Sequence, residues 1–140
     1  MKVCIHRGTQ EVGGTCIEIE SQGKRIVLDV GLPLEAADSI ESLPRVAGFR
    51  KWHESLLAVV ISHPHLDHYG LTRYLLPGTQ MIMGAATERI LKAAMLFTPV
   101  GVEFKNVLHL ESGKPLSIGP FTITPYLNDH SAYDAYSLLI

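Results

Sequence analysis

The feature that most constrains this chain is a dense group of histidines directly after an apolar segment. Residues 63–68 have the sequence HPHLDH and follow residues 56–61, whose sequence LLAVVI contains no polar side chain. An unbroken apolar run of this length predicts a strand that is buried on both faces of a sheet. Pro64 favours an extended backbone at His63, so the side chains of His63 and His65 can point in the same direction. The sequence therefore places several polar side chains at the carboxyl end of a buried strand, where α/β sheets carry their sites.

These side chains have the chemistry of metal ligands. Imidazole and carboxylate groups bind zinc, and they also bind iron or manganese. Asp67 and His68 fall where a helix is expected to begin, so they can turn toward a second point in space. The alternative is that these residues are ordinary polar side chains of an exposed loop. Four side chains of ligand type within six positions favour a metal site.

The rest of the sequence predicts a mixed sheet flanked by helices. Residues 15–20 (TCIEIE) alternate between polar and apolar, which is typical of a half-buried strand, and residues 85–97 carry Ala, Leu and Met at helical spacing. A further helix is expected over residues 69–76, because Pro77 and Gly78 would end it. Other strands are expected at residues 2–6, 25–30, 56–61, 80–83, 106–110, 115–118, 121–126 and 136–140. Strands dominate first and then alternate with helices, so the expected fold class is α/β (α+β).

The composition excludes several classes of protein. Twelve basic and fourteen acidic residues give a formal net charge of −2, which excludes binding to nucleic acid through overall charge alone. No stretch approaches the roughly 18 apolar residues that a membrane span needs. Neither Cys4 nor Cys16 lies in a C-x-x-C pair, and we expect both to be buried in strands. A cytoplasmic protein with no membrane partner is therefore expected.

The histidine-rich segment resembles the H-x-H-x-D-H signature of the metallo-β-lactamase fold superfamily of metallo-hydrolases. Residues 26–31 (IVLDVG) resemble the upstream strand of that superfamily, which ends in Asp-x-Gly and whose aspartate orients the histidine loop. Residues 128–131 (NDHS) resemble its third motif, a lone histidine after a strand. Within this superfamily, the sequence looks closest to the ribonuclease J and β-CASP nucleases. That likeness is carried by residues 61–71, by the histidine and serine of the third motif, and by the glycine-rich loop 8–14. The resemblance implies an αβ/βα sandwich.

The resemblance also implies a set of metal ligands. Three histidines would hold one ion, and an aspartate with a fourth histidine would hold a second: His63, His65 and His130, then Asp67 and His68. The implied cofactor is zinc, as one or two ions, with iron or manganese as alternatives. A metal-bound hydroxide would be the nucleophile, and Asp67 would be the catalytic residue that orients it or takes its proton. Asp29 would support the histidine loop from behind the ligands.

Two ligands of the superfamily have no counterpart in this sequence. Its later metal-bridging aspartate, found in a Gly-Asp step one strand beyond the third motif, is missing, and so is its final histidine. Asp134 lies too close to His130 to be that aspartate. The chain also stops on the apolar strand expected at residues 136–140, whereas domains usually finish in a polar tail. We therefore expect residues 1–140 to be the N-terminal part of a metallo-β-lactamase-like domain, whose second ion would have only two protein ligands unless another chain supplies more.

Three functions follow as hypotheses from this pattern. The first is hydrolysis of phosphodiester bonds in RNA or another nucleic acid by the full-length protein. The second is hydrolysis of a small ester, thioester or lactam, because the same motif serves many substrates on this fold. The net charge of −2 and the lack of a visible basic run favour this second hypothesis slightly. The third is a catalytically inactive fragment that self-associates through an exposed apolar sheet face.

Overall fold

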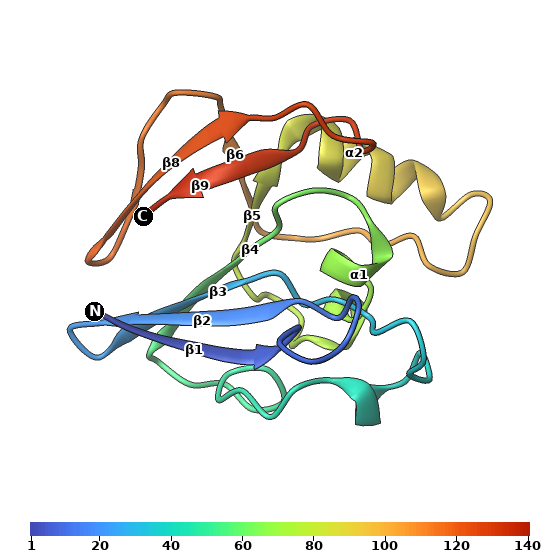
Figure 1. Ribbon diagram of the computed structural model, residues 1–140, viewed down its shortest axis with the longest axis horizontal. Helices are drawn as coiled ribbons and strands as arrows, with labels where there is room; N and C mark the ends of the chain where they lie inside the picture. Colours follow the sequence, from blue (N-terminus) through green and yellow to red (C-terminus); the bar gives the residue numbers. More distant parts are fainter.

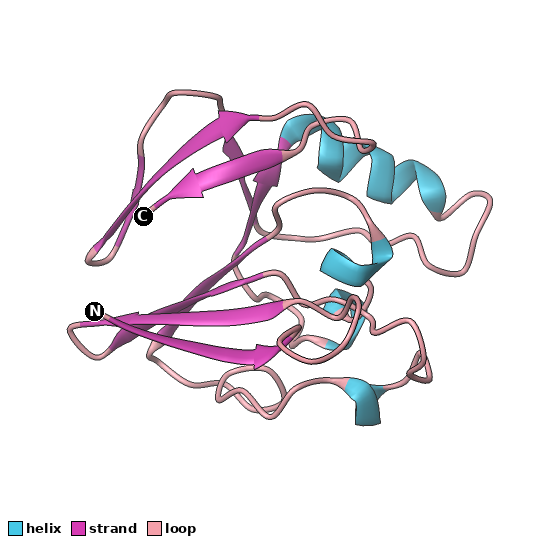
Figure 2. Cartoon of the chain, in the orientation of Figure 1, coloured by secondary structure: helices cyan, strands magenta, loops and turns pink.

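A computed structural model describes residues 1–140 as two β-sheets packed face to face, with helices on the outer face of the larger sheet (Figures 1 and 2). The larger sheet has the strand order β1-β2-β3-β4-β5-β6, and the smaller has the order β7-β8-β9. The strands are β1 Lys2–Arg7, β2 Cys16–Ser21, β3 Lys24–Leu28, β4 Leu56–Val60, β5 Met81–Gly84, β6 Val107–Leu110, β7 Leu116–Ile118, β8 Phe121–Leu127 and β9 Tyr136–Leu139. The helices are α1 Leu66–Tyr69 and α2 Ala85–Ala94, with short 3-10 turns η1 Ile40–Ser42 and η2 Thr72–Tyr74.

The larger sheet is mixed, which confirms the predicted fold class. Strands β1, β2 and β3 pair antiparallel, and strands β3 to β6 pair parallel. The apolar segment predicted at residues 56–61 forms β4, which lies in the interior of this sheet between β3 and β5. Val59 and Ile61 face one side of the sheet, whereas Ala58 and Val60 face the other. Burial on both faces explains why the segment carries no polar side chain.

Two apolar cores lie on the two faces of the larger sheet. The first lies between the sheet and its cover of α1, α2 and the connection from β3 to β4, which contributes the fully buried Phe49. The second lies between the two sheets, where Phe121 and Ile123 of β8 pack against side chains such as Ile26 and Ile82. Alternate residues of β8 point into this core, which is the two-residue period expected of a strand.

The parallel strands bring the predicted functional segments to one edge. Strands β3 and β4 are neighbours and run in the same direction, so the residues that follow them, Asp29 and Ser62, lie side by side. The backbone N–H of Tyr136, at the start of β9, donates to the carbonyl of Ser62 (3.0 Å). This bond joins the smaller sheet to the histidine loop of the larger one.

The prediction of a helix over residues 69–76 is wrong. Helix α1 begins earlier and ends at Tyr69, and the 3-10 turn η2 follows it. Leu71 leaves the helical conformation (ψ 1°), and its backbone N–H donates to the carbonyl of Val30 (3.0 Å) instead of to its own helix. A long-range backbone bond therefore replaces the local helical one.

Three smaller expectations also need correction. The strand expected at residues 25–30 ends at Leu28, because Asp29 takes a left-handed backbone conformation (φ +58°). Cys16 is fully buried, but Cys4 is exposed because β1 is an edge strand of the sheet. Strand β9 alternates between half-buried and exposed residues, so it is not the buried strand that the sequence predicts.

The longest helix, α2, has ten residues, and no helix in the structure combines the length and apolarity that spanning a membrane requires.

We predict that Phe121→Ala lowers the free energy of unfolding by about 3–5 kcal/mol, because it opens a cavity between the two sheets. Phe97→Ala is the matched control, since Phe97 is 85% exposed and its loss should cost well under 1 kcal/mol. Urea unfolding followed by circular dichroism measures both values. Equal losses for the two variants would contradict the assignment of Phe121 to the core.

Candidate metal centre

Three histidines from two loops come together at the carboxyl edge of the larger sheet. His63 and His65 lie in the loop between β4 and α1, and His130 lies in the loop between β8 and β9. One ring nitrogen of each histidine lies within 4.8 Å of those of the other two. The Nε2 atoms of His63 and His130 are 3.1 Å apart. The structure thus brings together the three residues for which the sequence predicts a common ion.

The geometry and chemistry of this cluster fit a divalent metal ion. A tetrahedral zinc ion with bonds of about 2.0–2.1 Å holds its ligand atoms about 3.4 Å apart, close to the separation of the two Nε2 atoms. Imidazole binds a metal in its neutral form. Burial, followed by the neighbouring histidines, lowers the pKa of His63 to about 4, so this imidazole is neutral near pH 7. Which metal the cluster prefers does not follow from three imidazoles alone.

A chain of hydrogen bonds presents Nε2 of His63 to the cluster. The hydroxyl of Ser62 lies 2.9 Å from a carboxylate oxygen of Asp29 and 2.9 Å from Nδ1 of His63. A carboxylate only accepts, so the hydroxyl donates to Asp29 and accepts from Nδ1–H of the imidazole. The proton of His63 therefore sits on Nδ1, and the lone pair of Nε2 faces His130.

Asp67 and His68 lie on α1, beside the three histidines. Oδ2 of Asp67 is 3.6 Å from Nε2 of His68, and the rings of His63 and His68 are 4.0 Å apart between centroids. The five predicted ligands thus form two adjacent groups, one of three imidazoles and one of a carboxylate and an imidazole. Their role as ligands stays a prediction.

Asp29 holds both groups in place from behind. Besides the Ser62 hydroxyl, its carboxylate accepts the backbone N–H of Ser62 (2.8 Å) and Nδ1–H of His68 (2.7 Å). Burial disfavours the charged form of His68, but the hydrogen bond and the charge of Asp29 outweigh it and raise the pKa of this imidazole. The bond also fixes the proton of His68 on Nδ1 and turns Nε2 toward Asp67. Asp29 thus contacts the histidine loop, and its role behind metal ligands stays a prediction.

The backbone around α1 leaves no room for a side chain at Gly31. A Cβ built there would lie 1.7 Å from the carbonyl oxygen of Asp67. This close approach lets neighbouring backbone N–H groups bind the carbonyls of α1: Thr15 to Asp67 (3.0 Å), Val30 to His68 (2.8 Å) and Leu32 to Leu66 (3.0 Å). The glycine of the Asp-x-Gly segment therefore allows the strand to dock against the residues that carry Asp67 and His68.

Asp134 anchors the loop of His130, a role that the sequence analysis missed. Its carboxylate accepts the backbone N–H of Thr87 (2.7 Å), in the first turn of α2, and the hydroxyl of Tyr136 (2.8 Å). The residue before α2 is Gly84, which has no side chain to cap the helix, so Asp134 supplies the cap from a distant loop. The only signal in the sequence was a helix that begins without a capping side chain of its own.

The remaining histidines lie outside the centre. Each has a polar neighbour elsewhere: His6 has Glu18 (3.5 Å), His53 has Ser55 (2.9 Å) and His109 has Glu88 (2.6 Å). They are structural or surface residues.

The fold and the cluster define a two-sheet α/β sandwich with a histidine centre fitted to a metal ion. Residues 9–90, more than half of the chain, match the family model described as the metallo-beta-lactamase superfamily. The chain belongs to this superfamily.

Among curated relatives, ribonuclease J of Helicobacter pylori (strain 26695) is 28% identical over 148 residues, covering 100% of this chain and 21% of the relative. Transcription termination factor FttA of Methanothermobacter thermautotrophicus is 37% identical over 68 residues, covering 49% of this chain and 11% of the relative.

Solved structures show the same fold. A protein of unknown function from Enterococcus faecalis V583 matches with a TM-score of 0.78 and 24% identity, over 97% of this chain and 39% of that one. MEM-A1, a subclass B3 metallo-beta-lactamase from a soil metagenome library, matches with a TM-score of 0.64 and 21% identity, over 90% of this chain and 50% of that one. The chain thus spans about half or less of these structures and about a fifth or less of the two curated relatives.

In protein freed of metal with a chelator, His63 makes the folded state sensitive to acid. Its pKa is 6.5 ordinarily and about 4 in the folded chain, so between these values the unfolded state binds a proton that the folded state does not. The free energy of unfolding therefore falls as the pH falls through this range. His68 acts in the opposite direction, because its raised pKa stabilises the fold at low pH and this contribution is lost as the pH rises.

We predict that His63→Gln reduces the loss of stability between pH 6.5 and 4, as measured by urea unfolding at a series of pH values. The comparison with the unchanged protein isolates His63, since His68 is present in both. Parallel curves for the two proteins would contradict the prediction.

A second prediction concerns the anchor at Asp134. Gly84 has an ordinary φ of −65°, so alanine fits its backbone, but a Cβ there would lie 2.0 Å from Oδ2 of Asp134. We expect Gly84→Ala to lower the free energy of unfolding by about 1–3 kcal/mol. In the double variant with Asp134→Ala the clash is gone, so the two losses should not add. Additive losses in urea unfolding would show that the two residues do not interact.

Proposed function

We propose that this protein is a metal-dependent hydrolase that cleaves phosphodiester bonds in RNA. The observation that carries the proposal is the convergence of His63, His65 and His130, from separate loops, on one point at the sheet edge. Ribonuclease J, whose similarity covers the whole chain, supports RNA as the substrate. An RNA substrate is also compatible with the predicted cytoplasmic location.

The three histidines would hold one ion, and Asp67 with His68 would contribute to a second. Zinc is the ion that we propose, because neutral imidazole and carboxylate ligands suit it, with iron or manganese as alternatives. A divalent ion at this site lowers the pKa of a water molecule that it binds and neutralises charge that develops on a phosphate.

The residues of this chain supply orientation and proton transfer. Asp67 lies at the start of α1 with its carboxylate toward His68, where it can orient an attacking water or take its proton. Asp29 keeps the Nε2 lone pairs of His63 and His68 turned into the site through the hydrogen bonds described above. The geometry is thus set before any ligand binds, which reduces the reorganisation needed during reaction.

We also propose that residues 1–140 are the N-terminal part of a larger metallo-β-lactamase-like domain. The chain spans about half of MEM-A1 and a fifth of ribonuclease J. The second ion has only Asp67 and His68 as candidate ligands in this chain. The remaining ligands would come from another part of the natural protein, or from a second copy that associates through an exposed sheet face.

A small ester, thioester or lactam is the second candidate substrate. The net charge of −2 favours it, since a polyanionic substrate is repelled by a negatively charged protein. The two candidates are separated by incubation with labelled single-stranded RNA and with a panel of chromogenic esters. Cleavage of the esters alone would rule out the RNA proposal.

The direct test combines metal content with cleavage. We predict at least one equivalent of zinc, iron or manganese in the purified chain, and RNA cleavage by the natural protein that contains residues 1–140. His65→Ala should reduce the metal content well below one equivalent and cleavage to background. His109→Ala is the matched control, because it removes an exposed histidine on β6 that lies outside the centre. An unchanged metal content in His65→Ala would overturn the site assignment.

A further inference from the structure

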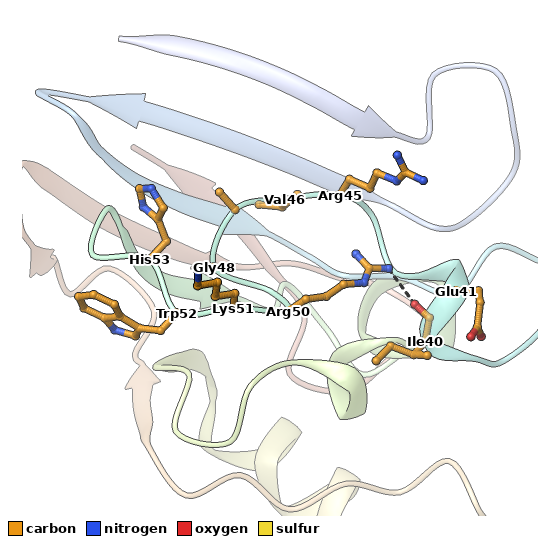
Figure 3. A pocket seen from close by; sticks show the side chains of 10 residues that line it. Ile40, Glu41, Arg45, Val46, Gly48, Arg50, Lys51, Trp52 and His53 are labelled. Atoms are coloured by element: carbon orange, nitrogen blue, oxygen red, sulfur yellow. Dashed lines mark hydrogen bonds between the residues drawn. The ribbon is translucent and has the colours of Figure 1, made fainter.

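A cationic cavity lies in the connection between β3 and β4, away from the histidine centre. It has a volume of about 940 Å³, and Figure 3 shows its lining. Trp52 and His53 lie at one end, Arg45 and Glu41 lie at the other, and Lys51 lies between them (Figure 3). The segment leads into the amino end of β4, whereas His63 follows its carboxyl end. The cavity and the histidine centre are therefore separate surfaces.

The side chains that line this cavity have a net positive charge, whereas the whole chain has a net negative charge. Its lining carries three cationic side chains against one carboxylate, Glu41, although the chain has a net charge of −2. Arg50 has a structural role, because its guanidinium donates to the carbonyls of three residues of the same connection: Ile40, Leu43 and Pro44. Arg45 and Lys51 are exposed and form no hydrogen bond or ion pair within the protein. Two cations are thus free to bind an anion.

The cavity also offers an exposed aromatic face. Trp52, the only tryptophan of the chain, is 76% exposed. His53 beside it uses Nδ1 for contacts with Ser55, and no contact occupies its Nε2. Free cations next to an exposed aromatic ring are what proteins use to bind single-stranded nucleic acid, with the cations on phosphates and the ring stacked on a base.

We propose that this cavity binds single-stranded RNA, with phosphates on Arg45 and Lys51 and a base stacked on Trp52. The choice of RNA rests on the proposed function, whereas the site itself rests on the cavity, its charge and its aromatic ring. The cavity would hold a part of the RNA remote from the bond that is cleaved, so it would favour long substrates over short ones. Stacking reads no sequence, and the contact would therefore be indifferent to base identity.

Trp52 reports binding through its own fluorescence. A short oligouridylate is titrated into the 140-residue chain in chelator, so that binding is measured without cleavage. We expect the fluorescence to be quenched, and the affinity to fall as salt rises. Removal of one phosphate contact, in Arg45→Ala or Lys51→Ala, should lower the affinity and reduce the slope of log affinity against log salt by about 0.7.

Two further variants test the role of the ring and the position of the charge. With a fluorescently labelled oligouridylate, Trp52→Ala should weaken binding about fivefold or more, and Trp52→Phe should retain most of the affinity. Lys105→Ala is the matched control, since Lys105 is an exposed lysine outside the cavity that also forms no ion pair, and it should bind normally.

The outcomes separate this proposal from the proposed function. Absence of quenching, an equal loss in Lys105→Ala, or equal quenching by polyglutamate or by anionic lipid vesicles would overturn the RNA cavity. Normal oligouridylate binding together with no RNA cleavage would overturn the proposed function alone. Unchanged cleavage of a dinucleotide in Arg45→Ala, with weaker cleavage of a long RNA, would support both.

Discussion

The carboxylate of Asp29 is the contact on which the histidine centre depends. It lies directly after β3 and binds both Ser62, which follows β4, and His68 on α1. Because β3 and β4 are parallel neighbours, their carboxyl ends meet, and one buried carboxylate can hold both the start of the histidine loop and the helix that follows it. It also determines which nitrogen of His63 and of His68 carries the proton. The left-handed backbone at Asp29 and the missing side chain at Gly31 are the local conditions that let this segment approach α1 so closely.

His130 reaches the centre by a separate route. Its loop is closed by the backbone bond from Asn128 to Ala135, anchored on α2 through Asp134, and joined to the histidine loop by the bond from Tyr136 to Ser62. The loops therefore come from different sheets and are fixed by different contacts, yet their imidazoles lie side by side. Ring nitrogens of three imidazoles gather at one point, and the hydrogen bonds of Ser62 hold the Nε2 lone pair of His63 toward it. Such a cluster of nitrogen donors is the physical reason to assign a metal to this point.

Much of the fold follows from the sequence because strands have a two-residue period and buried strands are continuously apolar. The spacing of the histidines in residues 63–68 likewise predicts a metal centre, and the structure brings His63 and His65 together with His130. The features that the sequence did not predict correctly are determined by contacts between distant residues. The backbone N–H of Leu71 binds the carbonyl of Val30 instead of continuing a helix. Asp134 caps α2, a helix that begins far earlier in the chain, at Ala85. The cationic cavity was also missed, since its cations stand in a segment with no periodic pattern.

In our proposals the two ends of β4 have different tasks, with hydrolysis at the histidine centre and retention of the substrate at the cationic cavity. The hydrolytic proposal depends on the assignment of one ion to His63, His65 and His130, and the choice of RNA for the cavity rests on that proposal. The most direct measurement is a crystal structure of the protein grown with zinc, with anomalous scattering recorded at the zinc edge. The account predicts one peak bonded to a ring nitrogen of all three histidines. A peak that excludes His130, or zinc bound only at Asp67 and His68, would contradict it.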